Sequence, residues 1–353
     1  MTIRTAVLGT GNWARTAHLP ALAAHPDVTV VACADPNIDL ARAAAETFGV
    51  PAAYDGLDSL LEHEESLSLL VVAAPDDVHP AAIRAALSRG VAVFCEKPLA
   101  NDAATADALS AQASATNVLA SVGYSFRYSP AVRALRADLL AGNLGEAWFI
   151  EVAEHNAQFH PLLGKELNWK GDPEHAAAGA LFEYGSHVLD LCLWLLGPVS
   201  AVSSHLVKVL PQSRLDDIAT LQLRFASGAA GTLVSSWLLT GGFPGIRIRL
   251  HGSRGLAEVE LNETIPGGER YSHYELDGRL RETVPTAALE HGPSSYARWH
   301  LADLVSAMTG HNRADVEVLP TIQQAADTQR VLDSALAATE SWAQIEPLSV
   351  VSR

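Results

Sequence analysis

The chain has 353 residues, more than most single hydrophobic cores contain, so two domains are expected. Its formal net charge is −16 and it has no basic block, which argues against a nucleic-acid partner and disfavours an anionic membrane surface. No apolar run reaches the length of a membrane span, and no signal-peptide pattern opens the sequence. We therefore expect a cytoplasmic protein whose cysteines, Cys33, Cys95 and Cys192, are core residues in a reducing compartment.

A glycine-rich segment follows the first expected strand, at 3–8. It reads Gly9-Thr-Gly-Asn-Trp-Ala14, the G-x-G-x-x-A variant of the dinucleotide fingerprint. Gly9 would allow the tight turn, Gly11 would let the backbone approach a pyrophosphate, and Ala14 would let the next helix pack closely. The amides and dipole of that helix favour phosphates. Alone the pattern is a weak signal, because glycine-rich turns are common.

An acidic residue ends the second expected strand, at 28–34. Asp35 lies at about the distance after the glycines where such fingerprints place an acid that bonds the ribose hydroxyls. A carboxylate there would repel a 2′-phosphate, so the sequence favours NAD over NADP. The alternative is that Asp35 only caps the helix after Pro36.

Strands and helices then alternate up to residue 122. Helices are expected at 39–48, 57–62, 77–88 and 101–115, the last capped by Asn101 or Asp102, and further strands at 67–74, 91–95 and 118–122. Strands separated by helices in this way predict an α/β domain with a doubly wound parallel sheet. His79, just past Pro75, either faces the binding crevice or packs at the start of a helix.

The strand at 91–95 ends in Glu96-Lys97-Pro98. Strand ends of this kind open onto the binding crevice of a parallel sheet. Lys97 is therefore either a solvated loop charge or a charge placed at a site.

From residue 124 the pattern becomes that of an α+β domain with a mainly antiparallel sheet. We therefore expect a first domain at 1–123 and a second at 124–353. Strands are expected at 147–153, 199–209, 218–225, 230–237, 246–251 and 257–261, and helices at 131–140, 296–309 and 320–338.

The strongly apolar helix expected near 178–197 is interrupted by three ionisable residues. Glu183, His187 and Asp190 are spaced four and three apart, which places them on one face. Buried ionisable groups are costly unless paired, so either a structural cluster or a functional site is possible, and three such groups favour a site. His187 is suited to proton exchange near neutral pH, and Glu183 could orient its ring. Without a second histidine at a ligand spacing, no metal is expected.

Two polar loops precede this helix and suit a polyhydroxylated ligand. They span 155–160 and 168–174 and contain His155 and Trp169. Trp169 would be either a stacking platform or a loop anchor.

Together these segments resemble the glucose–fructose oxidoreductase / inositol dehydrogenase (Gfo/Idh/MocA) family over nearly the whole chain. The motifs that carry the resemblance are Gly9-x-Gly11-x-x-Ala14, Pro75-x-x-x-His79, Glu96-Lys97-Pro98, Arg127-Tyr-Ser-Pro130 and Gly185-x-His187-x-x-Asp190. The resemblance implies a Rossmann domain, NAD(P)-dependent redox chemistry at a sugar or cyclitol carbon, and homodimers or homotetramers built through an open sheet.

The resemblance also implies roles for individual residues. Lys97 and His187 would be the catalytic pair, and a cis bond is expected at Lys97–Pro98. His187 would accept the hydroxyl proton and Lys97 would stabilise the alkoxide, although these roles could be exchanged. This chain departs from the family pattern at Glu183, where Asp is common, at Ser125, where Asn is usual, and at Ala74, where Thr is frequent.

Three sets of site residues follow. The expected catalytic residues are Lys97, His187 and Glu183. The expected cofactor contacts are Gly9, Gly11, Asn12, Trp13, Ala14, Asp35, Pro75, His79, Glu96 and Lys97. The expected substrate contacts are Lys97, Arg127, His155, Trp169, Glu183 and His187. Two other functions stay open, an NAD-dependent glycosidase-like enzyme and a dinucleotide-binding regulator without turnover.

Overall fold

The computed structural model describes residues 2–164, 171–174, 176–240, 245–265, 267–285, 292–310, 317–338 and 343–345. It divides into two compact units. Unit 1 is Met1–Ser125 with Ser294–Ala326, and unit 2 is Phe126–Pro293 with Asp327–Arg353. Within the described ranges, no helix combines the length and the apolar character that a bilayer crossing requires.

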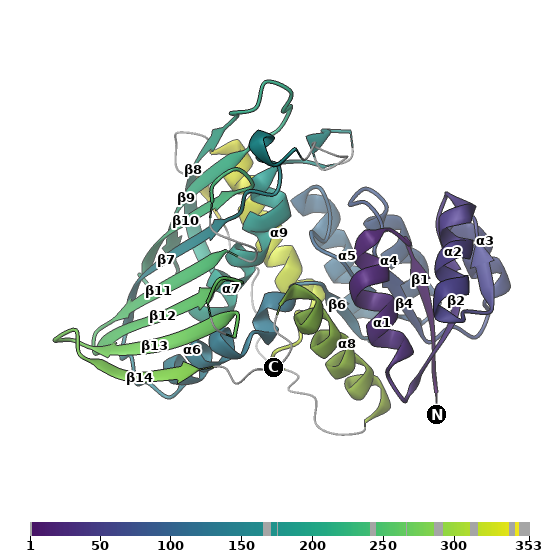
Figure 1. The fold of residues 1–353 in the computed structure, drawn as a ribbon, viewed down its shortest axis with the longest axis horizontal. Coiled ribbons are helices and arrows are strands. Elements are labelled where there is room, and N and C mark those ends of the chain that lie inside the picture. The colour runs from purple at the N-terminus through teal and green to yellow at the C-terminus, as the bar shows by residue number, and fades with distance from the viewer. Residues whose placement is uncertain are drawn as a thin grey trace. The chain divides into compact units, whose positions relative to one another are not determined.

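Unit 1 is built on a parallel sheet, as the sequence predicts, and this sheet has six strands. The strand order is β3-β2-β1-β4-β5-β6, and every neighbouring pair is parallel (Figure 1). The order reverses between β1 and β4, which is where open α/β sheets bind ligands, beyond the carboxyl ends of the strands. The strands are β1 (Ile3–Leu8), β2 (Val28–Ala34), β3 (Ala52–Tyr54), β4 (Leu69–Val72), β5 (Ala92–Cys95) and β6 (Ala120–Val122).

Two helices of unit 1 begin at capping residues that their sequences supply. Asn37 caps α2 by accepting a hydrogen bond from the Asp39 amide, and Asp102 caps α5 by accepting from the Thr105 amide. β4 and β5 are buried along their whole length, which explains their uninterrupted apolar sequences. The helices are η1 (Ala14–His18), α1 (Leu19–Ala23), α2 (Ile38–Phe48), α3 (Leu57–His63), α4 (His79–Ser88), α5 (Ala103–Thr116) and α8 (Pro293–Thr309).

Residues Ser294–Ala326 group with unit 1, although the sequence analysis placed them in the second domain. The physical reason is their bonding to β6. The hydroxyl of Ser121 lies 2.7 Å from the His300 Nε2 atom and donates to the Pro320 carbonyl at 2.7 Å. The Val122 amide donates to the same carbonyl at 3.0 Å. Such contacts, nearly 200 positions apart, cannot be read from local patterns.

Unit 2 contains a large, mainly antiparallel sheet, as predicted. Its order in the described residues is β14-β13-β12-β11-β7-β10-β9-β8-β15, and only the β7–β10 pair is parallel. The strands are β7 (Ala147–His155), β8 (Val199–Val207), β9 (Ile218–Phe225), β10 (Ala230–Ser236), β11 (Ile246–Gly252), β12 (Gly255–Leu261), β13 (Glu269–Glu275), β14 (Leu280–Pro285) and β15 (Ala343–Gln344).

The helices of unit 2 lie on one face of this sheet (Figure 1). β7 shows the resulting alternation, because Ile150, Val152 and Glu154 are buried while the residues between them are partly exposed. The helical elements are η2 (Ser125–Tyr128), α6 (Pro130–Leu140), η3 (Pro161–Leu163), η5 (Leu181–Gly185), α7 (Ser186–Leu196) and α9 (Ile322–Ala337).

Candidate functional site

The glycine turn after β1 is tightly packed at its first glycine and open at its second. Gly9 has φ +86°, and a Cβ there would lie 2.4 Å from the Ala73 carbonyl oxygen, so only glycine fits. A Cβ on Gly11 would meet no atom within 4 Å, so the backbone here is open to close approach. Asn12 and Trp13 start the helix, and Ala14 is buried at the beginning of η1, a π-helical turn. The turn can therefore accept a phosphate group at a helix start.

Asp35 is bonded to the glycine turn from the end of β2. Its Oδ2 accepts from the Thr10 amide at 2.9 Å and the Thr10 hydroxyl at 3.1 Å, and its Oδ1 accepts from the Asn37 amide at 2.9 Å. The N-cap of α2 is Asn37, so the alternative in which Asp35 only caps that helix is wrong. A carboxylate offers about four acceptor positions, so one remains for a hydroxyl donor.

Glu96 connects the end of β5 to the helix after the glycine turn. Its Oε1 accepts from the Trp13 indole N–H at 2.9 Å and lies 2.8 Å from His18 Nε2. A Cβ on Gly123 would lie 2.8 Å from Oε2, so a glycine leaves the space that this carboxylate occupies. Glu96 and Trp13, both expected at the cofactor, are thus bonded to each other.

His79 does not have a ring nitrogen available for a cofactor. Its Nδ1 lies 2.8 Å from the Pro98 carbonyl oxygen, its Nε2 lies 3.0 Å from the Ala74 carbonyl oxygen, and the residue is fully buried. The expected cofactor contact is therefore replaced by a structural one, in which His79 joins the segments that follow β4 and β5. Pro75 follows Ala74 directly at this switch point.

Lys97 stands at the carboxyl end of β5 and is partly exposed. The Lys97–Pro98 peptide bond is cis, as the family resemblance implies. The position is the one that the sequence analysis expects, at the edge of the sheet where ligands bind.

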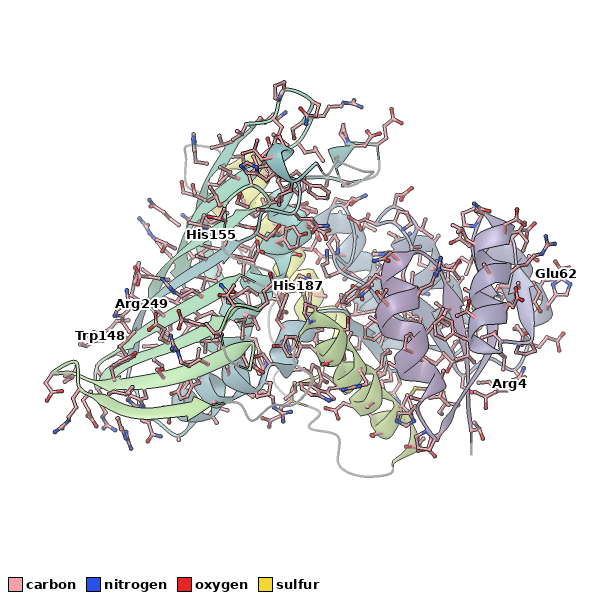
Figure 2. The ribbon with its side chains drawn as sticks, in the orientation of Figure 1. Arg4, Glu62, Trp148, His155, His187 and Arg249 are labelled. Carbon is pink, nitrogen blue, oxygen red and sulfur yellow. The ribbon has the colours of Figure 1, made fainter. Side chains whose placement is uncertain are left out.

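In unit 2, η5 and α7 form one continuous apolar helix with two accessible polar groups. From residue 181 to residue 192 only Glu183 and His187 are partly exposed, and every other side chain is buried. The helix start is fixed by the Asp216 carboxylate, which accepts from the Gly179 amide at 2.7 Å and the Leu181 amide at 2.9 Å. Figure 2 labels His187 on this helix. A π-helical turn precedes it, and such turns are frequent at functional sites.

The ring of His187 is held edge-on against Phe126. The two ring centroids are 4.9 Å apart and the ring planes make an angle of 83°. Phe126 belongs to η2, and the next residue, Arg127, is anchored to α7.

Arg127 and Asp190 form a buried ion pair, which corrects two expectations. Arg127 Nε donates to Oδ2 at 2.8 Å and Nη2 donates to Oδ1 at 2.5 Å, with both side chains 1% exposed. Burial raises the pKa of the Asp190 carboxyl, and the Arg127 charge offsets part of that rise. Arg127 is therefore not placed to bind a substrate, and Asp190 does not share the accessible face of Glu183 and His187.

His155 lies on the opposite sheet face from this helix. Alternation along β7 turns Glu154 toward η5 and His155 toward the other face, where burial and the nearby Arg247 lower the pKa of His155. The structure thus does not bring His155 together with Glu183 and His187. Trp169, the remaining expected substrate contact, lies outside the described residues.

The sequence did not indicate Glu154 as a site residue. It lies on the buried face of β7, next to the start of η5. It is 2% exposed, and burial raises its pKa to about 8, with the Glu183 charge adding to the rise. The signal was present in the strand pattern, because a glutamate takes the third place in the buried series after Ile150 and Val152. No cluster of three potential metal ligands occurs in the part of the chain that the structure describes.

Comparison with known proteins identifies matching families for both halves of the chain. A model described as "Oxidoreductase family, NAD-binding Rossmann fold" matches residues 3–124. A second model, the GFO/IDH/MocA C-terminal domain, matches residues 132–258.

Individual relatives share between 21% and 34% of residues with this chain over the matched regions. A putative UDP-kanosamine synthase oxidoreductase subunit of Amycolatopsis mediterranei is 34% identical over 200 residues, which are 57% of this chain and 53% of that protein. The matched region thus spans about half the length of that relative. Inositol 2-dehydrogenase of Rhizobium meliloti is 28% identical over 75% of this chain and 78% of its own. Levoglucosan dehydrogenase in complex with NADH has the same fold, with a TM-score of 0.87 at 21% identity, covering 99% of this chain and 100% of that one.

Proposed function

Because the chain belongs to the Gfo/Idh/MocA family of NAD(P)-dependent oxidoreductases, we propose that it moves hydride between nicotinamide and a sugar-like substrate. The reacting group would be a secondary alcohol or ketone of a sugar, cyclitol or related compound. Relatives named inositol 2-dehydrogenase, levoglucosan dehydrogenase and D-apiose dehydrogenase support this substrate class.

The observation that carries the proposal is the pair Glu183 and His187. They are the only partly exposed residues between 181 and 192, and the partly exposed residues farther along the helix, Leu193 and Leu196, are apolar. Placing an imidazole and a carboxylate one turn apart on a mostly buried helix costs folding free energy. The same placement leaves both groups accessible for proton transfer, so it supports a catalytic role. Phe126 restricts the imidazole from one side.

Each of three residues has a defined task in this proposal. His187 accepts the proton of the substrate hydroxyl, and Glu183 stabilises the imidazolium that forms. Lys97 donates a hydrogen bond to the same oxygen and stabilises the developing negative charge, a contribution of about 3 kcal/mol. The chemistry that a nicotinamide cofactor supplies when bound is reversible hydride transfer.

The residues after β1 and β2 fit a dinucleotide, and we propose NAD in preference to NADP. Gly11 leaves the turn open, and Asp35 keeps one acceptor position for a ribose hydroxyl. Its negative charge would repel a 2′-phosphate.

The test uses His187→Ala and Lys97→Ala with NADH absorbance across sugars, cyclitols and sugar acids. Each variant should lose about 10²–10⁴-fold in kcat, because proton transfer or charge stabilisation is removed. NAD binding, followed by intrinsic tryptophan fluorescence, should persist. His155→Ala is the matched control and should keep the parent rate, since His155 lies on the other sheet face.

Near-parental turnover in either active-site variant would show that the assigned role is wrong. Two results would replace the proposal itself. Bound NAD retained through gel filtration with glycoside cleavage but no net NADH would indicate a glycosidase-like enzyme. Stable NAD binding without turnover of any compound in the panel would indicate a regulator.

A further inference from the structure

On β7, Glu154 is a buried carboxyl group in a series whose preceding members are apolar. On β7 it follows Ile150 and Val152 on the face covered by η5 and α7, and it is 2% exposed. A buried carboxylate without a cation is costly, and a carboxyl group in such a place stays neutral instead. The proposed reaction mechanism assigns no role to the Glu154 carboxyl group.

The hydrogen bonds around Glu154 indicate where its proton lies. Asn156 Nδ2 donates to Oε1 at 2.8 Å. Oε2 lies 3.4 Å from the Ser235 hydroxyl oxygen, and that same hydroxyl lies 3.0 Å from the Ala180 carbonyl oxygen. A hydroxyl has a single proton and a carbonyl can only accept, so the shorter contact is the one that Ser235 donates. A hydrogen bond between Glu154 Oε2 and Ser235 would then use a proton on Glu154.

This arrangement connects Glu154 to the helical turn that carries Glu183. Ala180 is the N-cap residue of η5, so the series from Glu154 through Ser235 ends at the start of that turn. On the other side Asn156 Oδ1 accepts from the Gln158 amide at 3.0 Å. The Gln158 side-chain oxygen accepts from the Tyr184 hydroxyl. Glu154 is thus linked to η5 on both sides of its carboxyl group.

Two ionisable groups of η5, Glu183 and Tyr184, interact electrostatically with Glu154. Glu183 raises the pKa of Glu154 further after burial, and the hydrogen bonds donated by the Asn156 side chain and the Ser236 backbone amide offset part of the rise. Burial, and then the charges of Glu183 and Glu154, raise the pKa of Tyr184 well above its usual range, so Tyr184 stays protonated. The neighbouring strands contribute Ser235 and Ser236 from β10 and Ile246 from β11, none of which titrates.

We propose that Glu154 is a positioning residue that works as a neutral carboxylic acid: it holds the start of η5 through Ser235, and the negative charge of the two carboxyls stays on Glu183. The inference rests on the proposed function, in which Glu183 stabilises the imidazolium of His187. Loss of the Glu154 proton would remove the bond to Ser235 and place a second negative charge beside Glu183. Either change would disturb the carboxylate that orients the imidazole.

The kinetic test compares the pH profile of kcat in the parent enzyme and in Glu154→Gln. The amide can donate to Ser235 and accept from Asn156 but cannot titrate. We expect the parent rate to fall as the pH rises through about 8, the pKa of Glu154. Glu154→Gln should keep the parent rate near neutral pH and lose this decline. Glu154→Ala should lower kcat at every pH with NAD binding retained, and so should Glu183→Gln. A decline that persists unchanged in Glu154→Gln would overturn the positioning role.

A second measurement is independent of turnover. The folded protein would keep a proton that the unfolded chain releases near pH 4.3, the ordinary glutamate pKa, so more protons are bound in the folded state up to about pH 8. Stability should therefore decrease as pH rises through this window in the parent and less so in Glu154→Gln. The urea midpoints of both proteins, measured across the window, check this. Parallel curves would mean that Glu154 is ionised in the folded protein and would overturn the proposal, whether or not a substrate is known.

Discussion

The carboxylate of Glu96 accepts a hydrogen bond from the indole N–H of Trp13 at 2.9 Å. This contact joins the helix after the glycine turn to the residue that precedes Lys97. The glycine turn and the lysine proposed as catalytic are therefore held in one unit by a bond between residues 83 positions apart. Loss of the Trp13–Glu96 hydrogen bond should therefore lower the affinity for NAD.

Trp13→Phe removes the donor and keeps an aromatic ring. We expect NAD binding to weaken by about 1 kcal/mol, roughly fivefold in Kd, because one partly buried hydrogen bond is lost. Isothermal titration with NAD measures the change. Thr16→Ala is the matched control, since the Thr16 hydroxyl bonds only the Asn12 carbonyl on the exposed side of the same helix. Equal weakening in both variants would mean that the effect comes from the helix and not from Glu96.

Asp35→Asn tests the cofactor preference more sharply than removal of the side chain. The amide oxygen can still accept from Thr10 or Asn37, whereas the negative charge is gone. NADP affinity should rise relative to NAD affinity in Asp35→Asn, since the repulsion of the 2′-phosphate is relieved. Asp35→Ala should weaken NAD far more than NADP, because it also removes the ribose acceptor. Equal affinity for the two cofactors in the parent protein would exclude the preference.

Removing one partner of the buried pair Arg127–Asp190 should strongly destabilise unit 2. Asp190→Asn leaves a buried guanidinium without its counter-charge, so we expect a loss of about 3–5 kcal/mol in the free energy of unfolding. Urea denaturation measures it. Arg42→Ala, which breaks the exposed pair with Asp39, should change the midpoint little. The double substitution Arg127→Met with Asp190→Leu should recover part of the loss, because it leaves no unpaired charge. A small effect of Asp190→Asn alone would show that solvent reaches the pair.

The sequence predicts the strands of unit 1 well because several are buried on both faces and have continuous apolar sequences. It does not mark β3, whose three residues are too few to show a pattern. It also misses β13, in which the buried positions include Ser272 and His273 instead of apolar residues. Strand detection thus fails where polar side chains are satisfied by distant partners, as His273 is by Asp138 at 2.6 Å.

For the site, local motifs place Gly9, Gly11, Asp35, Lys97, Glu183 and His187 on the expected elements. What the motifs do not reveal is which side chains are already engaged. Arg127 and His79 are polar residues in motifs, yet Asp190 and two backbone carbonyls take up their hydrogen-bonding capacity. Helical spacing also groups Asp190 with Glu183 and His187. The structure distinguishes them, because Asp190 is buried and the other two are partly exposed. Whether a polar side chain can bind a ligand therefore depends on its hydrogen bonds to residues distant in sequence, which motif spacing does not show.

The π-helical turn at Leu181–Gly185 has a consequence for how this segment can change during evolution. Such a turn holds one residue more than the α-helical path would need. A single-residue deletion here would restore ordinary helix and would cause no break in the chain. It would, however, rotate Glu183 by about 100° relative to His187 and Asp190, since each residue advances an α-helix by that angle. A homologue with such a gap could keep the fold and the buried ion pair while losing the accessible acid, so insertions and deletions at this turn are informative about catalysis.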